Sequence, residues 1–200
     1  MADRLIANPV INGPYDAPAQ HYRFDDVGIT SEIVPGRRPS EFFIPVPQTR
    51  KRRGGQLQLA DPGATERIAQ NPFVNQVRRE VDKWRTLGYP HTTPTSKRLL
   101  NYWADPDREN RVMFCQREAA ETAIFLVEAA TKSGHPQLSA RLAEINDEFN
   151  AGLPRVALKM ATGTGKTVVM TMLIAWQTLN KVASPQDSRF TKRFLVVAPG

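Results

Sequence analysis

Hydrophobic and polar residues alternate along the middle of the chain with the spacing of an α-helix, and this pattern predicts a helical segment from about residue 71 to 150. Asn71-Pro72 marks the first helix start, because asparagine caps a helix and proline fits its first position. Gly88 marks the end of this helix. The apolar residues between the two signals recur on one helical face: Phe73, Val77, Val81 and Trp84.

Three more helices are predicted in the same segment. Thr93-Pro94 repeats the start signal for a short helix, and two further patterns predict helices over about residues 115–131 and 137–149. The short helix carries Tyr102 and Trp103, for which two interpretations stand. Aromatic rings can stack on nucleic acid bases, but aromatic residues at helical spacing more often belong to a core.

Residues 151–200 show a different pattern, in which short apolar runs alternate with polar connections. Residues 155–160 and 194–198 have the length and apolar character of buried strands, and residues 168–177 are long and apolar enough for a core helix. The order strand, helix, strand is typical of an α/β unit with a parallel sheet. Two such strands cannot close a domain, so we expect the chain to be the beginning of a longer protein.

Residues 1–70 are rich in proline, glycine and arginine and show little periodicity, so we expect an irregular N-terminal region. Phe42–Pro47 is compatible with an edge strand, since its two prolines exclude a central position in a sheet. Arg50–Gly55 is a short basic run. It is either a solvated loop or a loop that contacts phosphate groups.

A glycine-rich loop, Ala-Thr-Gly-Thr-Gly-Lys-Thr at residues 161–167, lies between the first predicted strand and the core helix. Glycines allow a tight turn that points several backbone N–H groups at one anion, and the N-terminus of the following helix favours the same negative charge. Lys166 would reach the β- and γ-phosphates, and the Thr167 hydroxyl would hold Mg²⁺. The predicted phosphate-binding residues are Thr162, Gly163, Thr164, Gly165, Lys166 and Thr167. Met160 stands where the general pattern has another glycine, and an ordinary turn between strand and helix is the alternative.

The composition limits the classes of protein to which this chain can belong and the compartments in which we expect it. Hydrophobic residues make up 40% and charged residues 24%, which is ordinary for a globular protein, and the net charge of +7 favours a polyanionic partner. The single cysteine, Cys115, excludes an intramolecular disulfide. The start of the chain lacks a signal peptide, and the longest apolar run is too short to span a bilayer. We therefore expect a cytoplasmic protein that has no membrane partner.

Lys159–Thr167 resembles the first motif of superfamily-two helicases and translocases, and it looks most like the motor subunits of type III and type I restriction enzymes. Two further segments agree with this resemblance in their order along the chain. Phe114–Thr122 resembles the glutamine-containing element that precedes the phosphate loop, and Val196–Gly200 resembles the strand and turn of the next motif. The resemblance implies a RecA-like phosphate-loop domain, whose first part would occupy residues 151–200.

The resemblance also implies roles for individual residues. In that family a glutamine amide reads the adenine edge with one donor and one acceptor, which places Gln116 against the adenine of ATP and makes Arg117 a stacking neighbour. The alternative is that Gln116 is an exposed residue at a helix start. Pro199 and Gly200 correspond to a turn that touches the backbone of single-stranded nucleic acid in relatives.

The function that the resemblance implies is that of the N-terminal part of an ATP-dependent DNA translocase or helicase, the restriction subunit of a type III-like restriction endonuclease. Its cofactors would be ATP and Mg²⁺, and its partners DNA and a methyltransferase subunit. The family's paired acids on a later strand, which hold Mg²⁺ and position water, are absent from these 200 residues, so we expect no useful ATP turnover by them alone. Two alternatives stand: a basic DNA-binding module whose nucleotide site is vestigial or regulatory, and a repair or remodelling helicase that has no nuclease.

Overall fold

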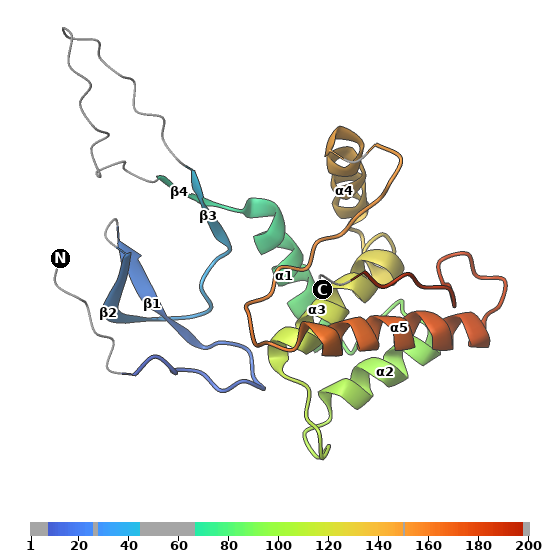
Figure 1. Cartoon of the computed structure of the whole chain (residues 1–200), viewed down its shortest axis with the longest axis horizontal. Helices are drawn as coiled ribbons and strands as arrows, with labels where there is room; N and C mark the ends of the chain where they lie inside the picture. The colour runs from blue at the N-terminus through green and yellow to red at the C-terminus, as the bar shows by residue number, and fades with distance from the viewer. Residues whose placement is uncertain (1–7, 26–27, 45–66, 150, 198–200) are drawn as a thin grey trace, which may run out of the picture. The chain divides into compact units, whose positions relative to one another are not determined.

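The computed structural model describes residues 8–25, 28–44, 67–149 and 151–197. The chain forms two compact units. The first unit comprises residues 1–13 and 17–76, and the second comprises residues 14–16 and 77–200. Helix α1, Pro72–Thr86, begins in the first unit and ends in the second (Figure 1).

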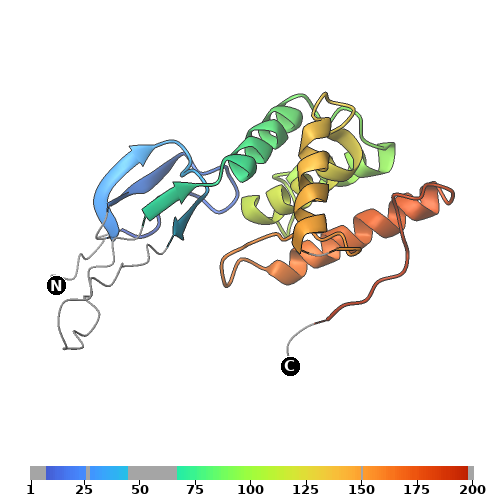
Figure 2. The same cartoon turned by 90° about the horizontal axis from the view of Figure 1, so that it is seen from above.

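The first unit contains two separate pairs of antiparallel strands (Figure 2). The strands are β1 (Gln20–Asp25), β2 (Gly28–Pro35), β3 (Glu41–Ile44) and β4 (Arg67–Gln70). β1 pairs with β2 and β3 pairs with β4, and the register of the first pair shifts between Tyr22 and Phe24. These strands lie within residues 1–70, where the sequence pattern shows little periodicity. The regular structure of this region comes from strand pairing, because hydrogen bonds between strands join backbone groups that turns and loops separate along the chain.

The edge strand that the sequence allows at Phe42–Pro47 is present in its first half, as part of β3. Residues 45–47 and the basic run Arg50–Gly55 lie outside the described residues. Asn75 of α1 holds the start of β3, because its Oδ1 accepts a hydrogen bond from the Ser40 N–H at 2.7 Å and its Nδ2 donates to the Ser40 carbonyl at 3.1 Å.

The second unit is helical. Its elements are α2 (Pro94–Ala104), α3 (Phe114–Ile124), the π-helical turn η1 (Phe125–Ala129), α4 (Pro136–Phe149) and α5 (Lys166–Ala183). With α1, these elements confirm the helices that the hydrophobic pattern predicts. Thr93 caps α2 by accepting a hydrogen bond from the Ser96 N–H at 3.1 Å, and Gly88 follows α1 with a φ of +73°. No helix that the structure describes has the length and apolar character needed to cross a lipid bilayer.

The core of the second unit lies between α2, α3 and α5, and Figure 1 shows α5 alongside α2. The buried side chains of these helices include Leu100, Ala120, Ile124, Val169, Met172 and Trp176. Trp103 is also buried, so the core interpretation holds for this residue. Tyr102 is 54% exposed, and the Arg108 guanidinium lies 4.1 Å from its ring centroid.

The parallel sheet predicted for residues 151–200 is not formed among the described residues. Residues 155–160 and 194–197 run without a strand partner (Figure 2). Several of their apolar side chains are consequently left in solvent, with Leu195 89% exposed and Val197 82% exposed. A strand is stabilised when a neighbouring strand pairs with its backbone N–H and C=O groups, and no described segment does so here.

A side chain takes the place of a strand partner at one position of the first apolar run. Asn146 of α4 accepts a hydrogen bond from the Arg155 N–H at 2.7 Å and donates one to the Arg155 carbonyl at 3.1 Å. These two bonds satisfy the backbone of a single residue, so they hold the run against α4 without making it a strand.

Candidate nucleotide-binding site

The loop before α5 turns sharply at two glycines. Gly163 and Gly165 have φ values of +79° and +71°, which lie in the left-handed region that residues with a Cβ rarely adopt. Gly165 is the N-cap of α5, and its carbonyl accepts hydrogen bonds from the N–H groups of Val168 at 2.9 Å and Val169 at 3.4 Å. The two glycines therefore allow the chain to pass from the apolar run directly into α5.

The N-terminus of α5 presents backbone donors. None of the described residues accepts a hydrogen bond from the N–H groups of Gly165, Lys166 or Thr167. Such groups at a helix start carry partial positive charge and favour an anion. The side chains of Thr162, Lys166 and Thr167 are exposed, so an anion can reach this end of the helix from solvent.

Lys166 adds a full positive charge to these donors. Its Nζ donates a hydrogen bond to the Ala161 carbonyl at 2.8 Å, and the Thr164 hydroxyl donates to the same carbonyl at 2.7 Å. The lysine side chain is thus folded over its own loop. An ammonium group has three N–H donors, so two remain for a ligand.

Gln116 lies in the first turn of α3 and is only 4% exposed. Its Oε1 accepts a hydrogen bond from the Met113 N–H at 3.0 Å, and its Nε2 donates one to the Thr164 carbonyl at 2.9 Å. Gln116 is therefore not an exposed residue at a helix start. Its amide joins the start of α3 to the glycine-rich loop across 48 positions of sequence.

A buried carboxylate lies further along α3 from Gln116. Glu121 accepts hydrogen bonds from Arg85 Nη2 at 2.6 Å and from the Tyr89 hydroxyl at 2.8 Å. Burial, with the nearby Glu121 charge, raises the pKa of Tyr89 well above its usual range, so this hydroxyl stays protonated. Arg117 approaches Glu121 at 3.5 Å and also lies 5.5 Å from the ring centroid of Phe114. In this structure Arg117 is thus engaged by groups of its own helix.

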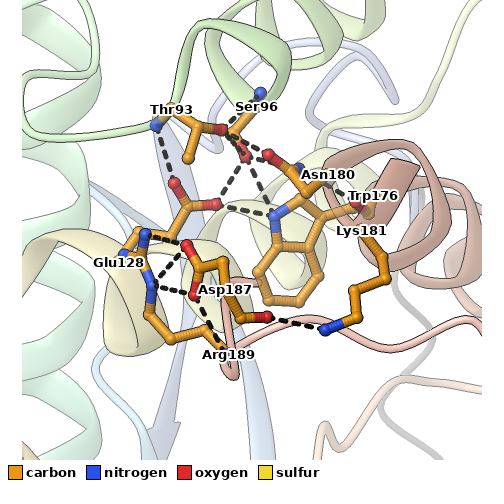
Figure 3. A network of polar contacts seen from close by, with 8 residues as sticks. All are labelled: Thr93, Ser96, Glu128, Trp176, Asn180, Lys181, Asp187 and Arg189. Carbon is orange, nitrogen blue, oxygen red and sulfur yellow. Dashed lines mark hydrogen bonds and ion pairs between the residues drawn. The ribbon is translucent and has the colours of Figure 1, made fainter. Parts of the chain in front are cut away.

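A second buried carboxylate fixes α5 against α2 and η1 (Figure 3). Glu128 of η1 is 2% exposed and accepts hydrogen bonds from the Thr93 N–H at 2.8 Å and Trp176 Nε1 at 2.7 Å. The Ser96 hydroxyl also donates to Glu128, and Asn180 of α5 donates to Ser96 Oγ at 2.9 Å. A buried charge without such donors would be costly. The network therefore holds α5, the helix whose first turn carries the loop.

The residues around the loop offer few ligands for a metal ion. The exposed Thr167 hydroxyl is the metal ligand that the sequence predicts. Among the described residues, no group of three or more His, Cys, Asp or Glu side chains is placed to hold a metal. Mg²⁺ keeps water ligands and is commonly bound through one or two protein groups and substrate phosphates, which fits a single hydroxyl at this position.

The structure brings together most of the residues that the sequence assigns to one site. The loop residues 162–167 surround the start of α5, and Gln116 touches them through Thr164. Pro199 and Gly200 lie outside the described residues. The supporting carboxylates Glu121 and Glu128 were not predicted, and the only signal in the sequence is an acidic residue within an apolar helical pattern.

The glycine turns, the open helix N-terminus and Lys166 together place backbone N–H donors and a positive charge at the start of α5, an arrangement that is suited to an anion. Residues 115–200 match the family model described as type III restriction enzyme, res subunit. The match includes Gln116 and residues 161–167, and it confirms the resemblance to a helicase-like restriction subunit over that part of the chain. Neither the curated proteins nor the solved structures contain a match to this chain.

Proposed function

We propose that this chain provides the phosphate-binding and adenine-binding half of the ATP site of a DNA translocase, the restriction subunit of a type III-like system. The observation that carries the proposal is the hydrogen bond between Gln116 and Thr164, which joins an amide suited to adenine to a loop suited to phosphates. The bond brings together two segments that lie 48 positions apart and that resemble two elements of one nucleotide site.

The loop residues would bind the triphosphate. The N–H groups of residues 165–167 would bind phosphate oxygens, and Lys166 would exchange its bond to the Ala161 carbonyl for bonds to the phosphates. Thr167 would hold Mg²⁺, which supplies charge neutralisation of the phosphates when it is bound.

Gln116 would bind the adenine base. A side-chain amide has two N–H groups and two acceptor lone pairs, and the bonds to Met113 and Thr164 use one of each. One donor and one acceptor remain, which is the pair that adenine requires. Since Gln116 is 4% exposed, base binding also requires local movement of the residues that cover the amide.

Two more general observations support DNA as the partner. The net charge of +7 favours a polyanion, and the match to a restriction subunit agrees with a DNA substrate. In such a motor, ATP binding and hydrolysis between two lobes would move one lobe along a strand. A methyltransferase subunit as a further partner rests on the family match alone.

Isothermal titration calorimetry of the chain with ATP and Mg²⁺ tests the proposal. Lys166→Ala should weaken ATP binding about 10- to 100-fold, because a hydrogen bond between charged groups contributes about 1.5–3 kcal/mol. Lys159→Ala is the matched control, since this exposed lysine precedes the loop and its loss changes the net charge equally. Equal ATP affinity in the two variants, or no ATP binding by the wild-type chain, would contradict the proposal.

The net charge also favours one non-enzymatic alternative, a basic DNA-binding module with a vestigial or regulatory nucleotide site. Such a module would bind DNA in a salt-sensitive way that ATP does not change. Fluorescence anisotropy of a labelled oligonucleotide, with and without ATP, separates the two functions. A dependence of DNA affinity on ATP that Lys166→Ala abolishes supports the translocase.

A further inference from the structure

The bond between Gln116 and Thr164 has a geometric consequence for the next residue of the loop. The peptide bond between Thr164 and Gly165 is trans, as are all described peptide bonds. In a trans peptide the C=O and the N–H groups point in opposite directions from one plane. Because Nε2 of Gln116 holds the Thr164 carbonyl at 2.9 Å, the Gly165 N–H is held pointing away from Gln116.

The Gly165 N–H is one of the donors at the start of α5 that no described residue uses. It precedes the first helical residue, where the positive end of the helix dipole lies. Gln116 therefore fixes the direction of a donor that belongs to the anion-binding set. Without this bond, the peptide plane between two turns would be free to rotate, since glycine tolerates both signs of φ.

Gln116 packs closely on the backbone of Gly165. A Cβ at residue 165 would lie 2.3 Å from Gln116 Nε2, so the amide could not keep its position if another residue replaced this glycine. The φ of +71° adds a second reason for glycine. The side chain of Gln116 and the backbone of Gly165 are thus fitted to each other.

We propose that Gln116 is a positioning residue of the phosphate loop, which orients the Gly165 N–H toward a bound polyphosphate whether or not a base is present. The proposal rests on the function proposed above, in which this loop binds a triphosphate. It gives one amide two separate tasks. One edge organises the loop and the start of α3, and the remaining donor and acceptor read the base.

Inorganic tripolyphosphate, which has no base, separates the two tasks. We expect Gln116→Met, which keeps the side-chain length and removes both polar groups, to weaken tripolyphosphate binding about 3- to 10-fold in calorimetric titrations of the whole chain. Gln116→Asn, whose amide is one methylene too short to reach Thr164, should weaken it in the same direction. This second variant retains a polar side chain and tests the proposal even if the methionine variant does not fold.

Gln177→Met is the matched control. Gln177 also ties a helix to a loop, because its Oε1 accepts a hydrogen bond from the Thr191 N–H at 2.9 Å, but it does not contact the phosphate loop. We expect tripolyphosphate affinity within twofold of wild type in this variant. In ¹H–¹⁵N spectra, tripolyphosphate should shift the Gly165 amide signal in the wild type, and this shift should be reduced in Gln116→Met.

Three results would overturn the positioning role. Wild-type tripolyphosphate affinity in both Gln116 variants, with ATP affinity reduced, would show that Gln116 only reads the base. An equal loss in Gln177→Met would show a general effect of loosening a loop. No binding of either ATP or tripolyphosphate by the wild-type chain would overturn the proposed function and this inference together, which distinguishes that case from the first two.

Discussion

Helix α5 and the segment 194–197 are both strongly apolar, yet only the helix is integrated into a core. Val169, Met172 and Trp176 of α5 are buried at 4–5% exposure, whereas Leu195 and Val197 are 89% and 82% exposed. Hydrophobic character alone therefore does not decide whether a segment of this chain is buried.

The difference follows from where each element finds its hydrogen-bond partners. A helix satisfies its backbone groups within its own segment, so α5 needs only a surface on which to place its apolar face. The packing of α2 and α3 provides that surface, and the network around Glu128 fixes the orientation. A strand needs the backbone of a neighbour, and the described residues offer none to 194–197.

The largest expected effect comes from breaking the docking of α5. Trp176→Ala should lower the free energy of unfolding by about 3–5 kcal/mol, because it empties a buried aromatic site and removes a donor to Glu128. Urea unfolding followed by circular dichroism measures this loss. Val182→Ala, on the same helix at a residue 67% exposed, should change stability by less than about 0.5 kcal/mol. Similar losses in the two variants would mean that the network does not hold α5.

A smaller effect, dependent on pH, is expected in the connection between α5 and the exposed run. Arg189 donates side-chain and backbone hydrogen bonds to Asp187, and they lower the pKa of that carboxyl from its ordinary value of 3.8 to about 2 (Figure 3). A lowered pKa means that the contribution to stability is complete above about pH 4 and is lost as the pH falls toward 2.

Asp187→Asn should therefore reduce the pH dependence of unfolding between about pH 4 and pH 2 and leave the dependence above pH 5 unchanged. Circular dichroism at a fixed, moderate urea concentration over pH 2–7 measures the two slopes. A mutant and a wild type with the same slope in the acid range would show that this ion pair does not stabilise the connection.

The smallest effect is expected in the exposed run itself. Leu195→Ser and Val197→Ser should leave the free energy of unfolding within about 0.5 kcal/mol of wild type, since neither side chain is buried. Val169→Ser, the same type of change at a residue 4% exposed, should cost several times more because it removes buried apolar surface and buries a hydroxyl. A large loss at residue 195 or 197 would show that this run is packed in solution.

The elements that the sequence predicts correctly are those whose signals are local. Thr93-Pro94 and Gly88 act at helix ends through bonds and backbone angles within a few residues. The two glycines of the loop likewise adopt the positive φ values that a tight turn demands. Strands at residues 155–160 and 194–198 were predicted from apolar character. The described residues 155–160 and 194–197 form no strand, because pairing depends on another segment that the described residues do not supply.

The two segments of the candidate site could also be recognised in the sequence. The loop at 161–167 and the element around Gln116 resemble motifs that follow one another in a known order along the chain, and the family match covers both. The sequence alone determined these motifs and the helices, because helix caps, periodicity and glycine turns act over short distances. Only the tertiary structure decided that Gln116 touches Thr164, and that Glu121 and Glu128 hold the supporting helices. These contacts join residues 32 to 48 positions apart, and hydrogen bonds at such separations arise from packing, which no local pattern specifies.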